Sequence, residues 1–400
     1  MIRVGFLINF NYLKWLGGFY VIKNLIYCIN AFSKKNEIEP ILIVKKKLSR
    51  AEIKEFKNIK LIKTNLFYNQ NLIQKVYNKL LIFLFGKLKN YEIFFKKNKI
   101  DVLSHINVLS NSVFLGKNSS IKSLPFLADL QHIHYPENFA SKNILLRNLN
   151  IRMCAAHSSK IILSSFDAKK DLKSISKSAY KKSVVNQFVF KTPRRDEILN
   201  LSSLKKKYKF NTNFFYLPNQ YWVHKNHIVV LESLKHIKKK YKSNKLLVIS
   251  TGHGEDHRNK SHFNKIMNFV NANNLQDNYK YLGIVPFNEV LSFIYHSIAL
   301  IHPSKFEGRS SSVEQAKSMG KKIILSNIAI HKEQNPARGI YFNPDKFLEL
   351  SSIMIKAWNK YNYINDKKFI NKASKKNKNS LLKYYKNYRK IITNVIWIIV

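Results

Sequence analysis

The densest group of chemically capable side chains lies in residues 302–320, which read His-Pro-Ser-Lys-Phe-Glu-Gly-Arg-Ser-Ser-Ser-Val-Glu-Gln-Ala-Lys-Ser-Met-Gly. We expect an apolar strand to end at His302 and an amphipathic helix to begin near Ser311, which puts Glu307 in the loop at the carboxyl end of a strand. The backbone N–H groups of residues 309–312 then open a helix N-terminus, where a phosphate is stabilised without a metal ion. The same pattern also fits a loop whose serines only cap the helix, and these residues alone leave both interpretations open.

The elements that must position this loop alternate between short apolar runs and longer amphipathic runs. We expect strands at residues 3–9, 40–44, 59–63, 101–105, 126–130, 160–164, 214–217, 246–250, 279–282, 299–302, 322–326 and 339–342. We expect helices at residues 19–32, 72–97, 227–240, 262–273, 287–295 and 312–319. This alternation is typical of parallel sheets covered by helices.

The sequence therefore predicts an α/β protein with two doubly wound, Rossmann-like domains that face a cleft. The expected domains are residues 1–195 and 196–365, followed by a helical tail over residues 366–400. The pattern of the first domain is interrupted near residues 192–202. In such folds a ligand binds outside the carboxyl ends of the strands, so the cleft is the expected site.

Residues 306–321 resemble the E-x₇-E region of the large group 1 family of retaining GT-B glycosyltransferases, and residues 324–336 and 339–344 also fit that family. Upstream, Leu217-Pro-Asn-Gln-Tyr-Trp-Val-His-Lys-Asn-His227 takes the place of the family's G-R-x₄-K segment. The stretches Thr251-Gly-His-Gly254 and Leu282-Gly-Ile-Val-Pro286 are similar to its next two landmarks. The order and spacing of the landmarks make the resemblance specific over about residues 215–345.

The first half of the chain matches the family more loosely, through Trp15-Leu-Gly-Gly18 and Asp129-Leu-Gln-His-Ile-His-Tyr-Pro136. The resemblance implies that Glu307 binds hydroxyls of the transferred sugar and that Lys225 pairs with the donor diphosphate. It also implies that His132 faces the reacting sugar. The donor-binding residues that it implies are Gly17, Gly18, Gln220, Gly252, Arg309, Ser310, Ser311, Ser312, Glu314 and Gln315.

In this family the donor phosphate itself is thought to take the acceptor's proton, which would explain why no pair of catalytic carboxylates stands out. The resemblance implies no cofactor and no metal, since the nucleoside-diphosphate sugar is a co-substrate. His132 and His134 form an H-x-H pair, but no Cys or acidic residue is spaced to complete a metal site. The expected activity is transfer of a sugar to a glycan or lipid-linked acceptor with retention, in surface polysaccharide synthesis.

Two departures from the family pattern concern the donor site. The second glutamate of the motif falls on Gln315, with Glu314 beside it, and the arginine five positions before Lys225 is replaced by Gln220. A glutamine still hydrogen-bonds a ribose but carries no charge, and Gln220 removes one cation from the phosphate site. The alternatives are therefore a catalytically silent protein of the same fold, a sugar-nucleotide epimerase, or a basic protein that binds polyanions. A phosphorylase would need a pyridoxal-phosphate lysine context that the sequence does not contain.

The formal net charge is +47, from 70 Lys and Arg residues against 23 Asp and Glu residues. This charge favours binding to polyanions, although the lysines are spread over the chain together with Asn and Ile, as expected of an A/T-rich genome. We expect no nucleic-acid partner. We do expect attraction to an anionic membrane surface, where lysine-rich helices such as residues 169–182 and 235–245 would lie near a lipid-linked acceptor.

Cys28 and Cys154 lie in apolar, helix-like stretches and are expected to be buried free thiols. The first residues read as a strand and lack the features of a signal peptide. No apolar run reaches the length needed to cross a bilayer. We therefore expect a protein of the cytoplasm, peripheral at the inner face of the membrane.

Overall fold

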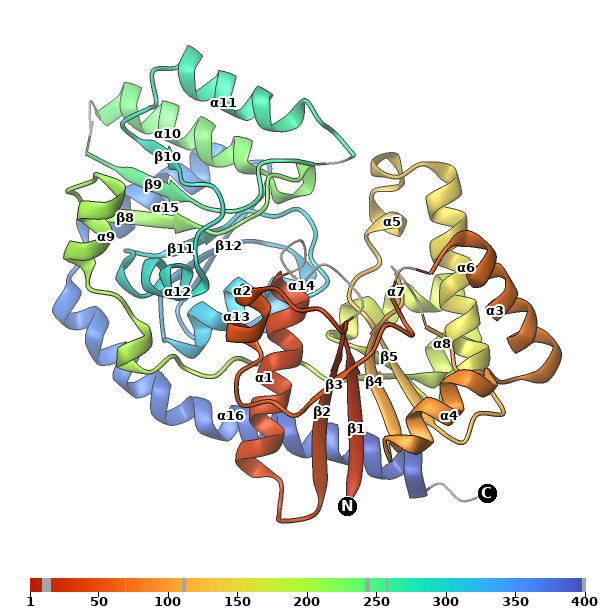
Figure 1. The fold of residues 1–400 in the computed structure, drawn as a ribbon. Helices are drawn as coiled ribbons and strands as arrows, with labels where there is room; N and C mark the ends of the chain where they lie inside the picture. Colours follow the sequence, from red (N-terminus) through yellow and green to blue (C-terminus); the bar gives the residue numbers. More distant parts are fainter. Residues whose placement is uncertain (9–15, 69, 110–112, 242–244, 257, 398–400) are drawn as a thin grey trace. The chain divides into compact units, whose positions relative to one another are not determined.

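The structure is a computed structural model that describes residues 1–8, 16–68, 70–109, 113–241, 245–256 and 258–397. It is an α/β protein with two parallel sheets, which confirms the predicted fold class. The chain divides into two compact units: unit 1 is Met1–Phe188 with Leu381–Val400, and unit 2 is Val189–Ser380. Each unit contains one of the sheets, with helices around it (Figure 1).

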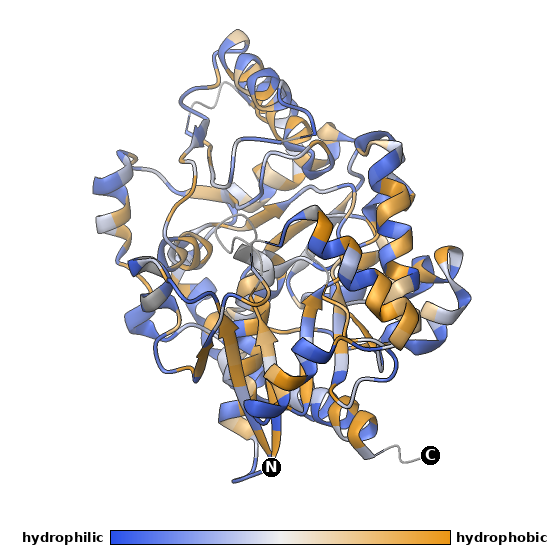
Figure 2. Ribbon diagram, turned by 45° about the vertical axis from the view of Figure 1, so that its right-hand side comes forward, coloured by the Kyte–Doolittle hydropathy of each residue, from blue (hydrophilic) through white to orange (hydrophobic). Residues whose placement is uncertain are grey.

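The sheet of unit 1 has seven strands in the order β3-β2-β1-β4-β5-β6-β7, and all its pairs are parallel. The strands are β1 (Ile2–Leu7), β2 (Ile38–Val44), β3 (Leu61–Lys63), β4 (Val102–Asn107), β5 (Lys122–Leu127), β6 (Ile161–Leu163) and β7 (Ser183–Val185). Its helices are α1 (Leu16–Phe32), α2 (Arg50–Glu55), α3 (Leu72–Phe85), α4 (Lys89–Lys97), α5 (Gln131–His134), α6 (Ser141–His157), α7 (Phe166–Ile175) and α8 (Lys177–Lys182). In Figure 2 the strand that begins at the N-terminus is drawn largely in the hydrophobic colour, because both faces of a parallel sheet are covered.

The single helix predicted for residues 72–97 is wrong, because the structure has two helices there, α3 and α4. The break is at Gly86, which adopts the left-handed conformation with φ 67° and donates its N–H to the carbonyl of Ile82 at 2.9 Å. The left-handed backbone favours glycine here, and a Cβ would also come within 2.4 Å of the side-chain amide of Asn118. Strand β7 was not predicted.

The sheet of unit 2 has six strands in the order β10-β9-β8-β11-β12-β13, again all parallel. The strands are β8 (Phe214–Leu217), β9 (Leu247–Ser250), β10 (Tyr279–Tyr281), β11 (Leu300–His302), β12 (Ile323–Ser326) and β13 (Gly339–Phe342). The helices are α9 (Leu201–Tyr208), α10 (His227–Tyr241), α11 (His262–Ala272), α12 (Phe287–His296), α13 (Ser311–Ser318), α14 (Ala329–Gln334) and α15 (Phe347–Asn359). The strand order reverses between β8 and β11, and in such sheets the ligand site lies beyond the carboxyl ends of these two strands.

The last helix, α16 (Tyr363–Trp397), contributes to both units. In unit 2, its Asp366 forms a buried ion pair with Lys321 and a partly buried one with Arg338. In unit 1, its Tyr388 is fully buried and donates a hydrogen bond to Ser104 at 2.8 Å. The residues predicted to form a separate tail therefore complete the packing of two different units.

Candidate donor-binding site

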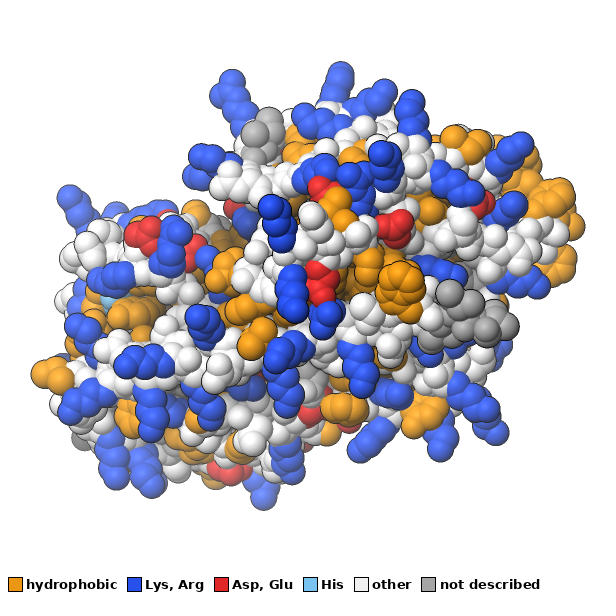
Figure 3. Space-filling view, turned by 90° about the horizontal axis from the view of Figure 1, so that it is seen from below, with side chains coloured by type: hydrophobic (Ala, Val, Ile, Leu, Met, Phe, Trp, Pro, Cys, Tyr) orange, Lys and Arg blue, Asp and Glu red, His pale blue; other side chains and the backbone are white. Residues whose placement is uncertain are grey.

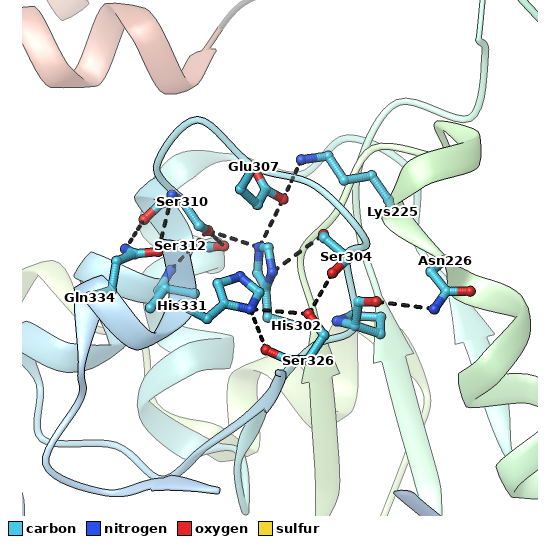
Figure 4. Close-up of polar contacts among 12 residues, drawn as sticks. Lys225, Asn226, His302, Ser304, Glu307, Ser310, Ser312, Ser326, His331 and Gln334 are labelled. Atoms are coloured by element: carbon cyan, nitrogen blue, oxygen red, sulfur yellow. Dashed lines mark hydrogen bonds and ion pairs between the residues drawn. The ribbon is translucent and has the colours of Figure 1, made fainter. Parts of the chain in front are cut away.

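Lys225 and Glu307 lie in the loops that follow β8 and β11, the two strands at the reversal of strand order. Their side chains meet, with Lys225 Nζ 2.6 Å from Glu307 Oε1 (Figure 4). Both are largely withdrawn from solvent, at 13% and 9% exposure. The fold thus joins the two residues to which the sequence assigned diphosphate and sugar binding, although 82 positions separate them.

The position of Lys225 depends on its neighbour Asn226, which adopts a left-handed conformation with φ 56°. The Asn226 amide donates hydrogen bonds to the carbonyl of Pro303 at 3.2 Å and to that of Pro344 at 2.8 Å. The backbone N–H of Lys305 donates to the carbonyl of His224 at 2.8 Å. These bonds hold the loop after β8 against the loops after β11 and β13, and so fix the direction of the lysine.

Gly252, at the end of β9, allows the loops after β8 and β9 to touch. Its φ is 144°, and a Cβ would lie 2.4 Å from the carbonyl oxygen of Asn219. The contact is completed by hydrogen bonds from the Gly252 N–H to Gly283 at 2.9 Å and from the Tyr221 N–H to His253 at 3.0 Å. Glycine is required here by packing, and Gln220 is carried on the loop that it supports.

The electrostatic state of the pair follows from its surroundings. Burial would raise the pKa of Glu307, but the charge of Lys225 outweighs this effect and the pKa is lowered to about 2. Burial, with a smaller effect of Lys225, holds the pKa of His224 well below its usual range, and burial does the same to the pKa of His302. At neutral pH the site therefore contains an ionised carboxylate between two neutral imidazoles.

The start of α13 is held by a hydrogen-bond network. Ser310 is its N-cap, and its hydroxyl accepts from the Val313 N–H at 3.3 Å. The same hydroxyl lies 2.8 Å from His302 Nε2 and 3.1 Å from the Ser312 hydroxyl, and Gln334 bonds both the N–H and the carbonyl of Ser310. His302 Nε2 is also 3.6 Å from Glu307 Oε1, so the cap and the carboxylate contact one imidazole (Figure 4).

Arg309 and Glu314 form an ion pair inside unit 2, with 2.6 Å between Arg309 NH2 and Glu314 Oε1. Their side chains are only 3% and 1% exposed, and Glu314 Oε1 also accepts from the Gln334 amide at 3.0 Å. Of the two residues left open for the second motif position, Glu314 is therefore held in internal contacts. Gln315 is buried in the same helix, whereas Ser311 is only partly buried.

The site residues predicted in the first half of the chain lie in unit 1. His132 is a buried residue of α5, with Nε2 2.9 Å from the side-chain oxygen of Asn148, and burial lowers its pKa. Within the described residues, its Nδ1 atom is buried and has no hydrogen-bond partner. Gly17 and Gly18 lie in the first turn of α1, whereas Trp15 is outside the described residues.

Sequence reasoning did not assign roles to Asn226, His302 and Gln334, which hold the site together. The available signal for His302 was its place as the polar last residue of an apolar strand, and for Asn226 its place next to Lys225. Gln334 gave no such signal, because its partners lie 24 and 20 positions away in the sequence. Within the parts of the chain that the structure describes, no three His, Cys, Asp or Glu side chains are grouped as a metal site.

Residues 202–385 match the sequence model of the family described as "Glycosyl transferases group 1". A search of curated protein sequences found no match.

Three solved structures share the fold at low sequence identity. A glycosyltransferase from Rickettsia africae is 16% identical, with TM-score 0.65 and 99% of both chains covered. HepE from Anabaena, solved in complex with UDP-glucose, is 14% identical, with TM-score 0.70 over 98% of this chain and 100% of its own. WaaG, described as a glycosyltransferase involved in lipopolysaccharide biosynthesis, is 12% identical, with TM-score 0.63 over 98% and 99%. Residues 202–385 therefore match the group 1 glycosyltransferase family, and the chain over nearly its whole length has the two-domain fold of GT-B glycosyltransferases.

Proposed function

We propose that this protein transfers a sugar from a nucleoside-diphosphate sugar to a glycan or lipid-linked acceptor, with retention of the anomeric configuration and without a metal ion. The observation that carries the proposal is the contact of Lys225 with Glu307 at the reversal of strand order. One side chain is a cation suited to a diphosphate, and the other is an ionised carboxylate suited to sugar hydroxyls.

In the proposed reaction the bond between the sugar's anomeric carbon and the diphosphate breaks, and a bond from the acceptor oxygen forms on the same face of the ring. The acceptor's proton passes to the departing phosphate oxygen. Lys225 stabilises the negative charge that grows on this oxygen, and Glu307 accepts hydrogen bonds from the sugar hydroxyls. Burial strengthens both interactions, because water does not screen them.

For the rest of the donor, the N–H groups of Ser311 and Ser312 at the start of α13 are proposed to bind the diphosphate, and Gln315 is the proposed contact for the ribose. Glu314 is the less suitable candidate, since Arg309 and Gln334 already hold its carboxylate. The roles that the resemblance implies for residues of unit 1, which are contact of His132 with the reacting sugar and of Gly17 and Gly18 with the diphosphate, are part of the proposal. The buried Nδ1 atom of His132, which has no partner among the described residues, supports this role.

Surface polysaccharide synthesis at the cytoplasmic face of a membrane is the proposed setting. The lipopolysaccharide enzymes WaaG and the galactosyltransferase WaaB share the fold, which supports a glycan or lipid-linked acceptor. Among the described residues, no helix is long and apolar enough to span a bilayer.

The proposal is tested by incubating the purified protein with a panel of nucleotide sugars and measuring release of nucleoside diphosphate, with and without a chelator. UDP-sugars come first, because HepE was solved with UDP-glucose. Release from one donor, unchanged by the chelator, is the expected result. Binding of every nucleotide without any turnover, also with glycan acceptors, would instead support a catalytically silent protein.

A further inference from the structure

Helix α3 (Leu72–Phe85) presents a continuous apolar stripe to solvent. The stripe follows the 3, 4, 7 spacing of one helix face, so its side chains lie side by side. Its exposed fractions range from 51% to 82% for Ile73, Val76, Tyr77, Leu80, Phe83 and Leu84. In Figure 3, hydrophobic side chains gather at the right-hand edge of the molecule, which is where α3 lies in Figure 1.

The stripe is not the face with which α3 joins its own unit. Ile82 is only 2% exposed and Leu81 packs against the core of unit 1. Asn78 donates a hydrogen bond to the hydroxyl of Tyr91 at 3.3 Å. The helix is therefore apolar on its inner and its outer side, a pattern that globular proteins normally bury completely. An exposed patch of this kind marks an interaction surface.

The charges beside the stripe indicate what binds there. Lys75 and Lys79 lie on α3, and Lys87 and Lys89 follow directly, all four with exposed side chains. No Asp or Glu occurs in residues 56–91. Apolar side chains flanked by lysines fit the boundary of a bilayer, where the lysine stems lie along the apolar layer and their ammonium groups reach anionic headgroups.

We propose that the α3 stripe inserts into the interfacial layer of an anionic membrane and anchors the protein there. A second copy of the chain is the poorer occupant, because a net charge of +47 opposes self-association. The stripe differs from the lysine-rich segments named from the sequence, residues 169–182 and 235–245, because it adds apolar insertion to charge. The proposal is separate from sugar transfer, since it concerns one surface of unit 1 and its test uses no sugar.

The test is flotation with phosphatidylcholine vesicles, with and without phosphatidylglycerol, at about 0.15 M salt. The double variant Leu80→Gln/Phe83→Gln removes two side chains that are 51% and 82% exposed, so the fold should persist. The matched control is Leu348→Gln/Ile364→Gln in unit 2, where the exposed fractions are 52% and 70%. In the α3 variant, the partition coefficient between vesicles and water should fall at least about tenfold. The control variant should have the same partition coefficient as the unchanged protein.

A direct measurement of insertion uses Phe83→Cys labelled with a polarity-sensitive dye. The native thiols Cys28 and Cys154 are buried, so the introduced thiol reacts first. The dye emission should shift to shorter wavelength on anionic vesicles, and a label at Ile364→Cys should not shift. Equal flotation of the α3 variant and the control would overturn the proposal in favour of binding by charge alone. A dimer that dissociates in the α3 variant, without vesicle binding, would overturn it in favour of a second copy.

Discussion

At the scale of single residues, the candidate site contains a buried ion pair, and an exposed ion pair in the same unit serves for comparison. Lys225 and Glu307 are 13% and 9% exposed, whereas Lys305 and Asp345, 2.5 Å apart, are 38% and 68% exposed. An exposed ion pair contributes little to the free energy of unfolding, whereas removal of one partner of a buried ion pair destabilises the protein strongly. The exposed pair is therefore the control for substitutions in the buried pair.

Replacement of Glu307 by Gln should abolish sugar transfer and leave the fold intact, because the side chain keeps its shape. The lost charge-assisted hydrogen bonds should raise the barrier by on the order of 2–4 kcal/mol. Turnover of the donor, together with the circular dichroism spectrum, checks this. Asp345→Asn should turn over like the unchanged protein. A Glu307→Gln variant with most of its turnover would remove Glu307 from the reaction.

Replacement of Lys225 by Ala should weaken the binding of both the free nucleoside diphosphate and the intact donor, since both contain the diphosphate. The expected loss is about 1.5–3 kcal/mol in binding free energy, as for a charge-assisted contact. Titration calorimetry measures it, with Lys305→Ala as the control. The substitution also leaves Glu307 without its main counter-charge, so its pKa should rise. Equal calorimetric affinities for the two lysine variants would exclude Lys225 from the donor site.

At the scale of elements, the site is made by loops that leave neighbouring parallel strands at the same edge of the sheet. The amide of Asn226 joins three of these loops, since it bonds the carbonyls of Pro303 and Pro344 from the turn after β8. The side-chain bonds of Gln334 join α14 to the start of α13 in the same way. These hydrogen bonds therefore connect the loops, and the geometry of the candidate site depends on the two amides.

Removal of the Asn226 amide should cost about 1–3 kcal/mol of unfolding free energy and weaken nucleotide binding as well. Asn226→Gly keeps the left-handed backbone that the φ of 56° requires, and so isolates the two hydrogen bonds. Asn226→Ala adds backbone strain and should be less stable still. Urea unfolding of both variants, beside calorimetry, checks the prediction. If Asn226→Gly equals the unchanged protein in both measurements, the amide does not position the loops.

The elements that the sequence predicted well are those with local causes. The bounds of β8 and β13 agree with the prediction because each is a short apolar run between polar turns. The break at Gly86 was missed because its signal, one glycine, is weak until the contact with Asn118 is seen. The family resemblance gave Lys225 and Glu307 separate roles at the donor but did not predict their contact, which follows from the order of strands. The roles given to Gln315 and His132 stay predictions.

At the scale of the whole molecule, several histidines are buried in neutral form in both units. Burial lowers the pKa of His105 to about 3, that of His227 to about 3 and that of His331 to about 4. Below the ordinary pKa of 6.5 the unfolded chain binds protons at these residues and the folded chain does not. Stability is therefore complete above pH 6.5 and is lost as the pH falls toward 4.

The unfolding free energy should fall between pH 7 and pH 5, by at most about 1.4 kcal/mol per pH unit for each such histidine. Glu307 affects stability only at lower pH, because a carboxyl with a lowered pKa changes the unfolding free energy only below the ordinary pKa of 4.5. Chemical unfolding at a series of pH values measures the slope. High salt is the control, because it screens repulsion among surface lysines but not the cost of charging a buried imidazole. A flat profile in high salt would contradict the prediction.

The division of α16 between the units has a consequence for the order of events at the ribosome. Unit 2 is one uninterrupted segment, so it is complete once residue 380 has emerged. Unit 1 begins first but lacks residues 381–397 until then, and among them Tyr388 and Ile392 are fully buried. Unit 2 should thus complete its folding before unit 1. Until then, unit 1 should be a partly open intermediate with an exposed apolar surface that chaperones would bind.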